Sequence, residues 1–76
     1  MERNDLIMFL QSLNINQARY SFDRVKKSDC ISLIQEDGRW NIYYTERDKP
    51  ELIANFENEC DANVFIANDF KRQNLD

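Results

Sequence analysis

The first apolar residues of the chain recur with the spacing of a helix. Leu6, Leu10 and Leu13 follow one another at intervals of four and three residues, which places their side chains on one side of an α-helix. Asn4 and Asp5 precede the run, and asparagine and aspartate are favoured N-cap residues. The pattern predicts a first helix over residues 4–13.

A weaker pattern follows this helix. Residues 18–23, with the sequence ARYSFD, alternate between apolar and polar side chains, as a half-buried strand does. The next residues, 24–29, are mostly polar and end the alternation. A short strand is therefore expected over residues 18–23, followed by a turn.

Residues 30–47 predict a β-hairpin, because two β-rich runs flank Asp37 and Gly38. Asp-Gly tolerates the positive φ angles of a two-residue type I′ turn, so it predicts a β-hairpin. Counting outward pairs Glu36 with Arg39 and continues to the pair of Ile31 with Tyr44. Alternation along the strands then separates two faces. One face, expected to be the core side, carries Ile31, Leu33, Trp40, Ile42 and Tyr44, and the other carries Ser32, Ile34, Asn41, Tyr43 and Thr45.

The last third of the chain predicts a strand and a second helix. Lys49-Pro50 indicates a loop, because proline cannot donate a hydrogen bond to a sheet. Residues 51–56 (ELIANF) can form a final strand, bulged or at an edge. Asn58 is a good N-cap for a helix that runs to about residue 72. The helix has an apolar stripe of Ala62, Phe65, Ile66 and Phe70.

These elements define the expected fold class. The order is an N-terminal helix, an antiparallel meander of three to four strands, and a C-terminal helix. A sheet with one apolar face needs a cover, which two amphipathic helices can supply. The sequence predicts an α+β two-layer sandwich that forms a single domain over residues 1–76, in keeping with the length of the chain.

The net charge of the chain limits the kinds of molecule that it can bind. Fourteen acidic and ten basic side chains give a formal net charge of -4, which argues against binding to nucleic-acid phosphates. An acidic surface suits a basic protein partner, although the charge can also serve solubility alone. Arg24, Lys26 and Lys27 form the one basic cluster and follow Tyr20 and Phe22. Such a cluster can contact single-stranded nucleic acid or can be a solvated turn, and the second interpretation is favoured.

Residues able to catalyse a reaction or to hold a metal ion are scarce. The chain has no histidine, which removes the most common general base, and its cysteines, Cys30 and Cys60, lack the spacing of a zinc site. Both are interpreted as packing residues, and two unpaired thiols favour a reducing cytoplasm. The apolar run at residues 6–10 is too short to span a bilayer. We expect a cytoplasmic protein that is not an enzyme and that uses no cofactor, metal or membrane.

The acidic side chains around the predicted final strand are the best candidates for contacts with a partner. Glu46 and Arg47 could act as a catalytic pair, but adjacent strand residues point to opposite faces, so an ion pair to a helix is the preferred interpretation. Tyr43 can serve as an interface anchor or can cover Ile34 on a wet sheet face. The expected partner-binding surface consists of Tyr43, Thr45, Glu46, Asp48, Glu51, Glu57 and Glu59, with the last two beginning the second helix beside the others.

One segment also resembles a known family. The run from Trp40 to Arg47 (WNIYYTER), followed by residues 56–62 (FENECDA), resembles the small bacterial immunity proteins of polymorphic-toxin and contact-dependent growth inhibition systems. In that family a W-x-V-Y-Y-x-E-R-G stretch precedes a phenylalanine and an acid-rich helix start. Asp48 stands where the pattern has glycine, which leaves the geometry of the turn after Arg47 open. Cys60 precedes Ala62 instead of following the helix alanine.

The resemblance implies a function of binding. It implies an antitoxin in the cytoplasm that binds a cognate toxin domain and blocks its active site or its access to substrate. The acidic charge favours a basic toxin such as a nuclease, and the antitoxin is expected as a monomer or a weak dimer. The alternative function is that of a small adaptor or regulatory subunit of a cytoplasmic assembly.

Overall fold

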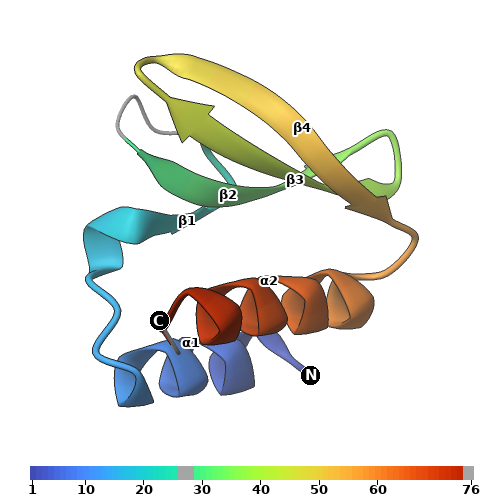
Figure 1. The fold of residues 1–76 in the computed structure, drawn as a ribbon. Helices are drawn as coiled ribbons and strands as arrows, with labels where there is room; N and C mark the ends of the chain where they lie inside the picture. The colour runs from blue at the N-terminus through green and yellow to red at the C-terminus, as the bar shows by residue number, and fades with distance from the viewer. Residues whose placement is uncertain (26–28, 75–76) are drawn as a thin grey trace.

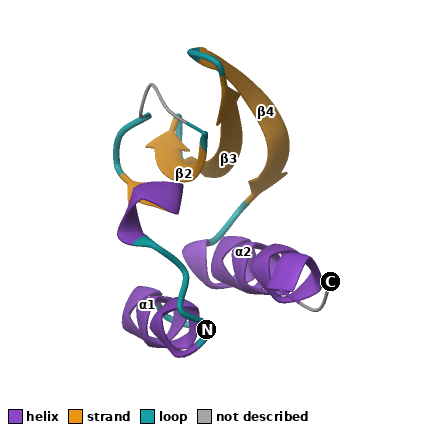
Figure 2. Cartoon of the chain, turned by 60° about the vertical axis from the view of Figure 1, so that its left-hand side comes forward, coloured by secondary structure: helices purple, strands orange, loops and turns teal. Residues whose placement is uncertain are grey.

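The fold is a four-stranded sheet with both helices on one side of it. The computed structural model describes residues 1–25 and 29–74, and the two views agree on the arrangement of the helices (Figures 1 and 2). The α+β fold class predicted from the sequence is confirmed. In chain order the elements are α1 (Arg3–Ser12), the 3-10 turn η1 (Gln17–Arg19), β1 (Tyr20–Phe22), β2 (Cys30–Glu36), β3 (Arg39–Glu46), β4 (Lys49–Phe56) and α2 (Glu59–Asn74).

The central hairpin has the predicted register. Strands β2 and β3 are antiparallel, and their pairs run from Glu36 with Arg39 to Cys30 with Thr45. Asp37 and Gly38 have φ angles of 53° and 77°, as a type I′ turn requires at both central positions. This hairpin therefore fixes which side chains of β2 and β3 face the helices.

Strand β1 differs from the antiparallel expectation. It lies at the edge of the sheet, in the order β1-β2-β3-β4, and runs parallel to β2 with Tyr20 beside Ile31 and Phe22 beside Leu33. A parallel neighbour requires a crossover connection instead of a tight turn. The Ser21 hydroxyl donates to the carbonyl of Arg24 at 2.8 Å, so this connection begins over the sheet face that the helices do not cover.

Strand β4 starts earlier than the proline suggested. Lys49 and Pro50 belong to the strand, opposite Glu46 and Thr45. Pro50 is tolerated because β4 is an edge strand. Such a strand has a neighbour on one side only, so the missing N–H of proline costs no hydrogen bond to a second strand. The turn is formed instead by Arg47 and Asp48, with φ angles of 51° and 67°. This second turn has the positive φ angles of a type I′ turn without glycine.

A bulge in β4 changes the face of the sheet toward which its later side chains point. Ile42 pairs with Ala54, whereas the next residue, Tyr43, pairs with Leu52, so Ile53 is an extra residue in β4. After one inserted residue, each following side chain of the strand points to the opposite face of the sheet. As a result Phe56 faces α2, and its ring centroid lies 5.7 Å from that of Phe65. The sequence prediction of a bulged or edge strand is confirmed.

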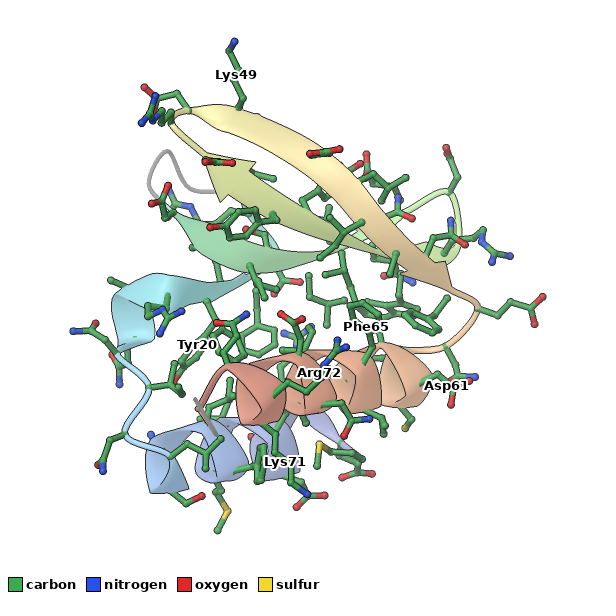
Figure 3. The ribbon with its side chains drawn as sticks, in the orientation of Figure 1. Tyr20, Lys49, Asp61, Phe65, Lys71 and Arg72 are labelled. Atoms are coloured by element: carbon green, nitrogen blue, oxygen red, sulfur yellow. The ribbon has the colours of Figure 1, made fainter. Side chains whose placement is uncertain are left out.

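The core lies between the inner face of the sheet and the two helices. In Figure 3, Tyr20 and Phe65 are drawn in this layer, and the Tyr20 ring meets the Phe70 ring edge to face at a centroid distance of 6.4 Å. Burying such side chains contributes about 1.5 to 3 kcal/mol each. The buried core residues are Leu6, Leu10, Tyr20, Ile31, Leu33, Ile42, Ala62, Ile66, Ala67 and Phe70.

The helix ends show one confirmed cap and one correction. The Asn58 side chain accepts from the Asp61 amide at 2.9 Å, as predicted for the N-cap of α2. Helix α1 begins one residue before the predicted start, so Asn4 lies within it and Glu2 occupies the N-cap position without a side-chain hydrogen bond. Neither α1 nor α2, the two α-helices of the described ranges, has the length and apolar character needed to cross a membrane.

The turn at Arg47 and Asp48 yields a test of the fold. We expect Asp48→Gly to raise the free energy of unfolding by about 0.5 to 1 kcal/mol, because glycine adopts positive φ without the steric cost that a Cβ imposes. Urea denaturation followed by circular dichroism measures the change. Glu57→Gly is the matched control, since it also removes a carboxylate but at a position outside the positive-φ set. Equal effects of the two changes would contradict the assigned turn.

Candidate functional site

The acidic side chains expected to form one surface lie at two ends of the sheet. Glu46, Asp48 and Glu51 are exposed around the turn between β3 and β4. From that turn β4 runs antiparallel to β3 along its whole length, and a strand of this size spans more than 20 Å. Glu57 and the start of α2 are therefore carried to the opposite end. The prediction that these groups lie together overlooked that even a strand limited to residues 51–56 carries Glu57 to the far end of the sheet.

The two acidic residues at the opposite end have partners within the fold. Glu57 lies 3.8 Å from a guanidinium nitrogen of Arg39, next to the Asp37-Gly38 turn, and remains 85% exposed. Glu59 accepts from Arg3 at 2.8 Å, and this ion pair joins the first turn of α2 to α1. The prediction that Glu57 and Glu59 share a surface with Glu46 is wrong, and Glu59 has a structural contact instead.

Thr45 is a second correction. It lies on the predicted face of the sheet, opposite the helices, but its side chain is fully buried. Its neighbours Cys30 and Ser32 on the same face are buried too, with the sulfur and the hydroxyl 3.5 Å apart. The described start of the segment after β1 lies on the same face, where the Ser21 hydroxyl donates to the Arg24 carbonyl. Thr45 therefore belongs to the interior and offers no contact to a partner.

Tyr43 lies half-buried on the outer face and is held by hydrogen bonds. Its phenol donates to Glu36 Oε1 at 2.6 Å, and Asn41 Nδ2 donates to the same oxygen at 3.0 Å. These two donors favour the charged carboxylate, so they lower the pKa of Glu36 below its ordinary value. The same bond, together with partial burial, raises the pKa of Tyr43.

The hydrogen bonds continue across the sheet to β4. Asn55 Nδ2 donates to Asn41 Oδ1 at 3.1 Å, and the Arg39 guanidinium donates twice to Asn55 Oδ1 at 2.6 and 2.9 Å. Glu36, Arg39, Asn41, Tyr43 and Asn55 together form what we call the outer-face network. The network orders three strands on the face that no helix covers.

Tyr44, and not Tyr43, stands with the carboxylates at the turn between β3 and β4. It belongs to the inner face of the sheet, yet 38% of it is exposed. Across the strands it pairs with Ile31 on one side and Glu51 on the other. Alternation along β3 predicts Tyr44 for the core side, but the helices do not cover the inner face as far as this residue.

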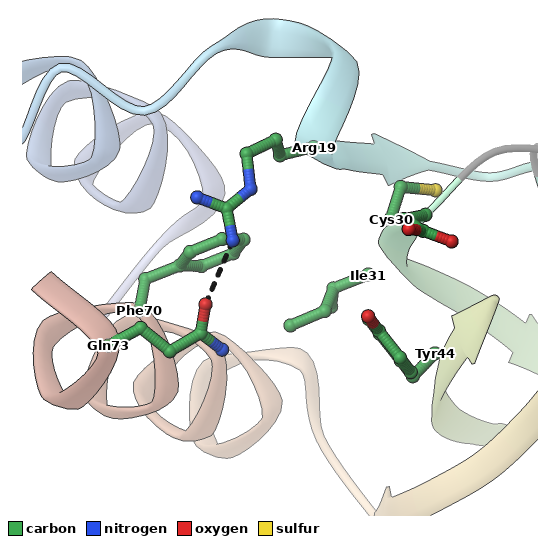
Figure 4. A pocket seen from close by; sticks show the side chains of 7 residues that line it. Arg19, Cys30, Ile31, Tyr44, Phe70 and Gln73 are labelled. Carbon is green, nitrogen blue, oxygen red and sulfur yellow. Dashed lines mark hydrogen bonds between the residues drawn. The ribbon is translucent and has the colours of Figure 1, made fainter. Parts of the chain in front are cut away.

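Two cavities meet at Tyr44. The first, of about 330 Å³, lies between η1, the start of β2 and the end of α2, and its labelled side chains are drawn in Figure 4. The second, of about 290 Å³, lies beside the turn. We call the second cavity, with Tyr44 as its inner wall, the turn-end groove. Its lining residues are Tyr44, Glu46, Arg47, Lys49, Pro50 and Glu51.

The other sequence candidates show no reactive arrangement. Cys30 is buried and Cys60 is exposed, so only the first is a packing residue. Arg47 lies in the turn and Glu46 in the strand, and neither forms an ion pair with a helix within residues 1–25 and 29–74. No group of metal-binding side chains occurs in the same ranges. Of the basic cluster, Lys26 and Lys27 lie outside the described residues.

The bond between Tyr43 and Glu36 yields a pH prediction. Because the folded pKa of Glu36 is lowered, its hydrogen bonds stabilise the fold above the unfolded pKa, and this contribution is lost as pH falls through the folded pKa. We expect Tyr43→Phe to raise the pKa of Glu36 toward the ordinary glutamate value. Carboxyl chemical shifts in an NMR pH titration measure it. Tyr44→Phe is the control and should leave Glu36 unchanged, whereas an unchanged pKa in Tyr43→Phe would contradict the network.

Comparison with known proteins adds no relative from which a function could be transferred. No family model matches the chain, and neither the curated proteins nor the solved structures contain a significant match. The resemblance of Trp40–Arg47 to immunity proteins therefore stays a prediction that rests on those residues.

Proposed function

We propose that this protein is an immunity protein, an antitoxin that binds a cognate toxin domain and neutralises it by covering the active site or the path of the substrate. The observation that carries the proposal is the exposed cluster of Glu46, Asp48 and Glu51 beside a half-exposed tyrosine, Tyr44. The segment that resembles immunity proteins contains two of these residues. Both tyrosine and complementary charge are typical of the surfaces by which proteins bind one another.

The charges indicate the nature of the toxin. At the turn end, Arg47 and Lys49 lie beside these acids, but no lysine or arginine nitrogen of the described ranges lies within 4 Å of a carboxylate oxygen of Glu46, Asp48 or Glu51. Unpaired carboxylates on a protein of net charge -4 attract a basic partner and accelerate its association. A nuclease is a fitting partner because it must itself attract phosphates.

The titration behaviour of the outer face supports binding over catalysis. A general acid or base works best with a pKa near the operating pH. Glu36 has a lowered pKa and Tyr43 a raised pKa, so both shifts move away from neutrality. Their hydrogen bonds hold a surface in one geometry, which lowers the entropy cost of docking. The outer-face network is thus suited to being a rigid support for contacts.

The proposal is tested first in cells. The proposal predicts that a secreted protein with a variable C-terminal domain is encoded beside this chain, and that domain is the toxin to use. Co-expression is expected to restore growth to cells that produce this toxin domain, with no effect on growth in its absence. Failure to restore growth while both proteins are present at equal levels would overturn the proposal. Association instead with a conserved cellular complex would support the adaptor function.

The location of the contact is tested by association kinetics. Neutralising the turn end should slow association about tenfold at low salt, and the difference should shrink as salt screens the charges. The variant is Glu46→Gln, Asp48→Asn and Glu51→Gln. The control removes the same amount of charge elsewhere and consists of Glu2→Gln, Asp5→Asn and Glu57→Gln. Stopped-flow fluorescence measures both rates, and equal slowing by the two sets would show that only net charge matters.

A further inference from the structure

Strand β4 exposes apolar side chains along a free edge of the sheet. Among the described residues the sheet has two edges, β1 and β4, and β1 is only three residues long. In β4, Leu52 is 51% exposed and Ile53 is 42% exposed. A long apolar edge strand is a template on which another chain can add a further strand. The edge of β4 is therefore the place where two copies of this chain would pair.

The pairing of β4 with β3 shows which main-chain groups of β4 point toward this edge. Glu46 and Lys49 close the two-residue turn, so they form a hydrogen-bonded pair. Pairs alternate along an antiparallel ladder, and the next pair, Thr45 with Pro50, is consequently not hydrogen-bonded. The main-chain groups of Pro50 thus point outward. Because proline has no N–H, a donor is missing at the first outward position.

The bulge breaks the regular spacing of the outward groups beyond Pro50. Leu52 pairs with Tyr43 and is the next outward residue. After the extra residue, Ile53, the ladder resumes with Ala54 on the inward side, so Asn55 is the following outward residue. Leu52 and Asn55 are three residues apart, whereas a neighbouring strand bonds to every second residue. The bulge also bends β4, as Figure 2 shows.

A charged side chain stands at the start of the same edge. Figure 3 shows Lys49 extending away from the body of the protein. Lysine, proline and a bulge each hinder the pairing of edge strands, and β4 combines all three within residues 49–53. The features lie next to the two exposed apolar side chains, where pairing would otherwise be favoured.

We infer that Pro50 and the bulge at Ile53 close the edge of β4 to a further strand and so prevent a second copy of this chain from pairing there. The side chains of Leu52 and Ile53 remain exposed, but the main-chain groups beside them do not form a regular template. A partner can therefore contact this edge through side chains only. The inference is independent of the antitoxin function, because it concerns the geometry of one strand.

The experiment makes the edge regular and measures self-association by sedimentation velocity. Deletion of Ile53 leaves Leu52 opposite Tyr43 and Ala54 opposite Ile42, so the two faces of β4 are preserved and the outward groups regain a spacing of two residues. Pro50→Thr restores the missing N–H. The chain with both changes is expected to dimerise at least about tenfold more strongly than the wild-type chain, which should stay monomeric up to about 1 mM.

Ile53→Ser is the matched control, since it removes the same exposed side chain as the deletion but keeps the extra residue. Association driven by exposed apolar surface would weaken in both variants, whereas a regular edge strengthens association only in the deletion. Amide hydrogen exchange locates the contact. In the dimer of the chain with both changes, the amides of Leu52 and Asn55 should become protected.

Two results would overturn the inference. The first needs no variant and is a wild-type chain that dimerises with protected amides at Leu52 and Asn55. The second is a chain with both changes that keeps the wild-type circular dichroism spectrum and yet remains monomeric up to about 1 mM.

Discussion

The register between β2 and β3 is the constraint on which the other features depend. The Asp37-Gly38 turn sets it, and a slip of one residue would exchange every side chain between the apolar inner face and the outer face. Leu33 and Ile42 would then leave the core. The outer-face network requires the same register, since Tyr43 reaches Glu36 only when Ser32 lies opposite it. Core and surface are thus specified by one local turn.

The features predicted correctly from the sequence are those encoded by neighbouring residues. Asp37-Gly38 determines the hairpin, and Asn58 caps α2 through a bond to an amide three residues on. The parallel pairing of β1 was missed, because it depends on contacts between residues 11 positions apart that no local pattern records. The proline placed the loop at Lys49-Pro50, two residues after the observed turn at Arg47 and Asp48, because neither turn residue is glycine and the strong local signal of an Asp-Gly turn is absent.

In the candidate site, too, the features encoded by neighbouring residues were predicted and those that depend on distant contacts were not. Exposed carboxylates at Glu46, Asp48 and Glu51 follow from residue type alone, and their grouping follows from a tight turn. The exposure of Tyr44 could not be predicted from alternation, which assigns a face but does not say how far a helix covers it. The end of the sheet beyond the helices consequently combines the aromatic surface of an inner face with the charge of a turn. A partner can meet both without any rearrangement of the core.

The contact between α1 and α2 has a consequence for the synthesis of the protein. The two helices are the first and last elements of the chain, and Asn63 of α2 also donates to the carbonyl of Met1 at 3.1 Å. A chain leaving the ribosome exposes Leu6 and Leu10 long before their cover exists. The nascent protein therefore completes its core only after Phe70 has emerged, and until then Leu6 and Leu10 lack the side chains that bury them in the fold.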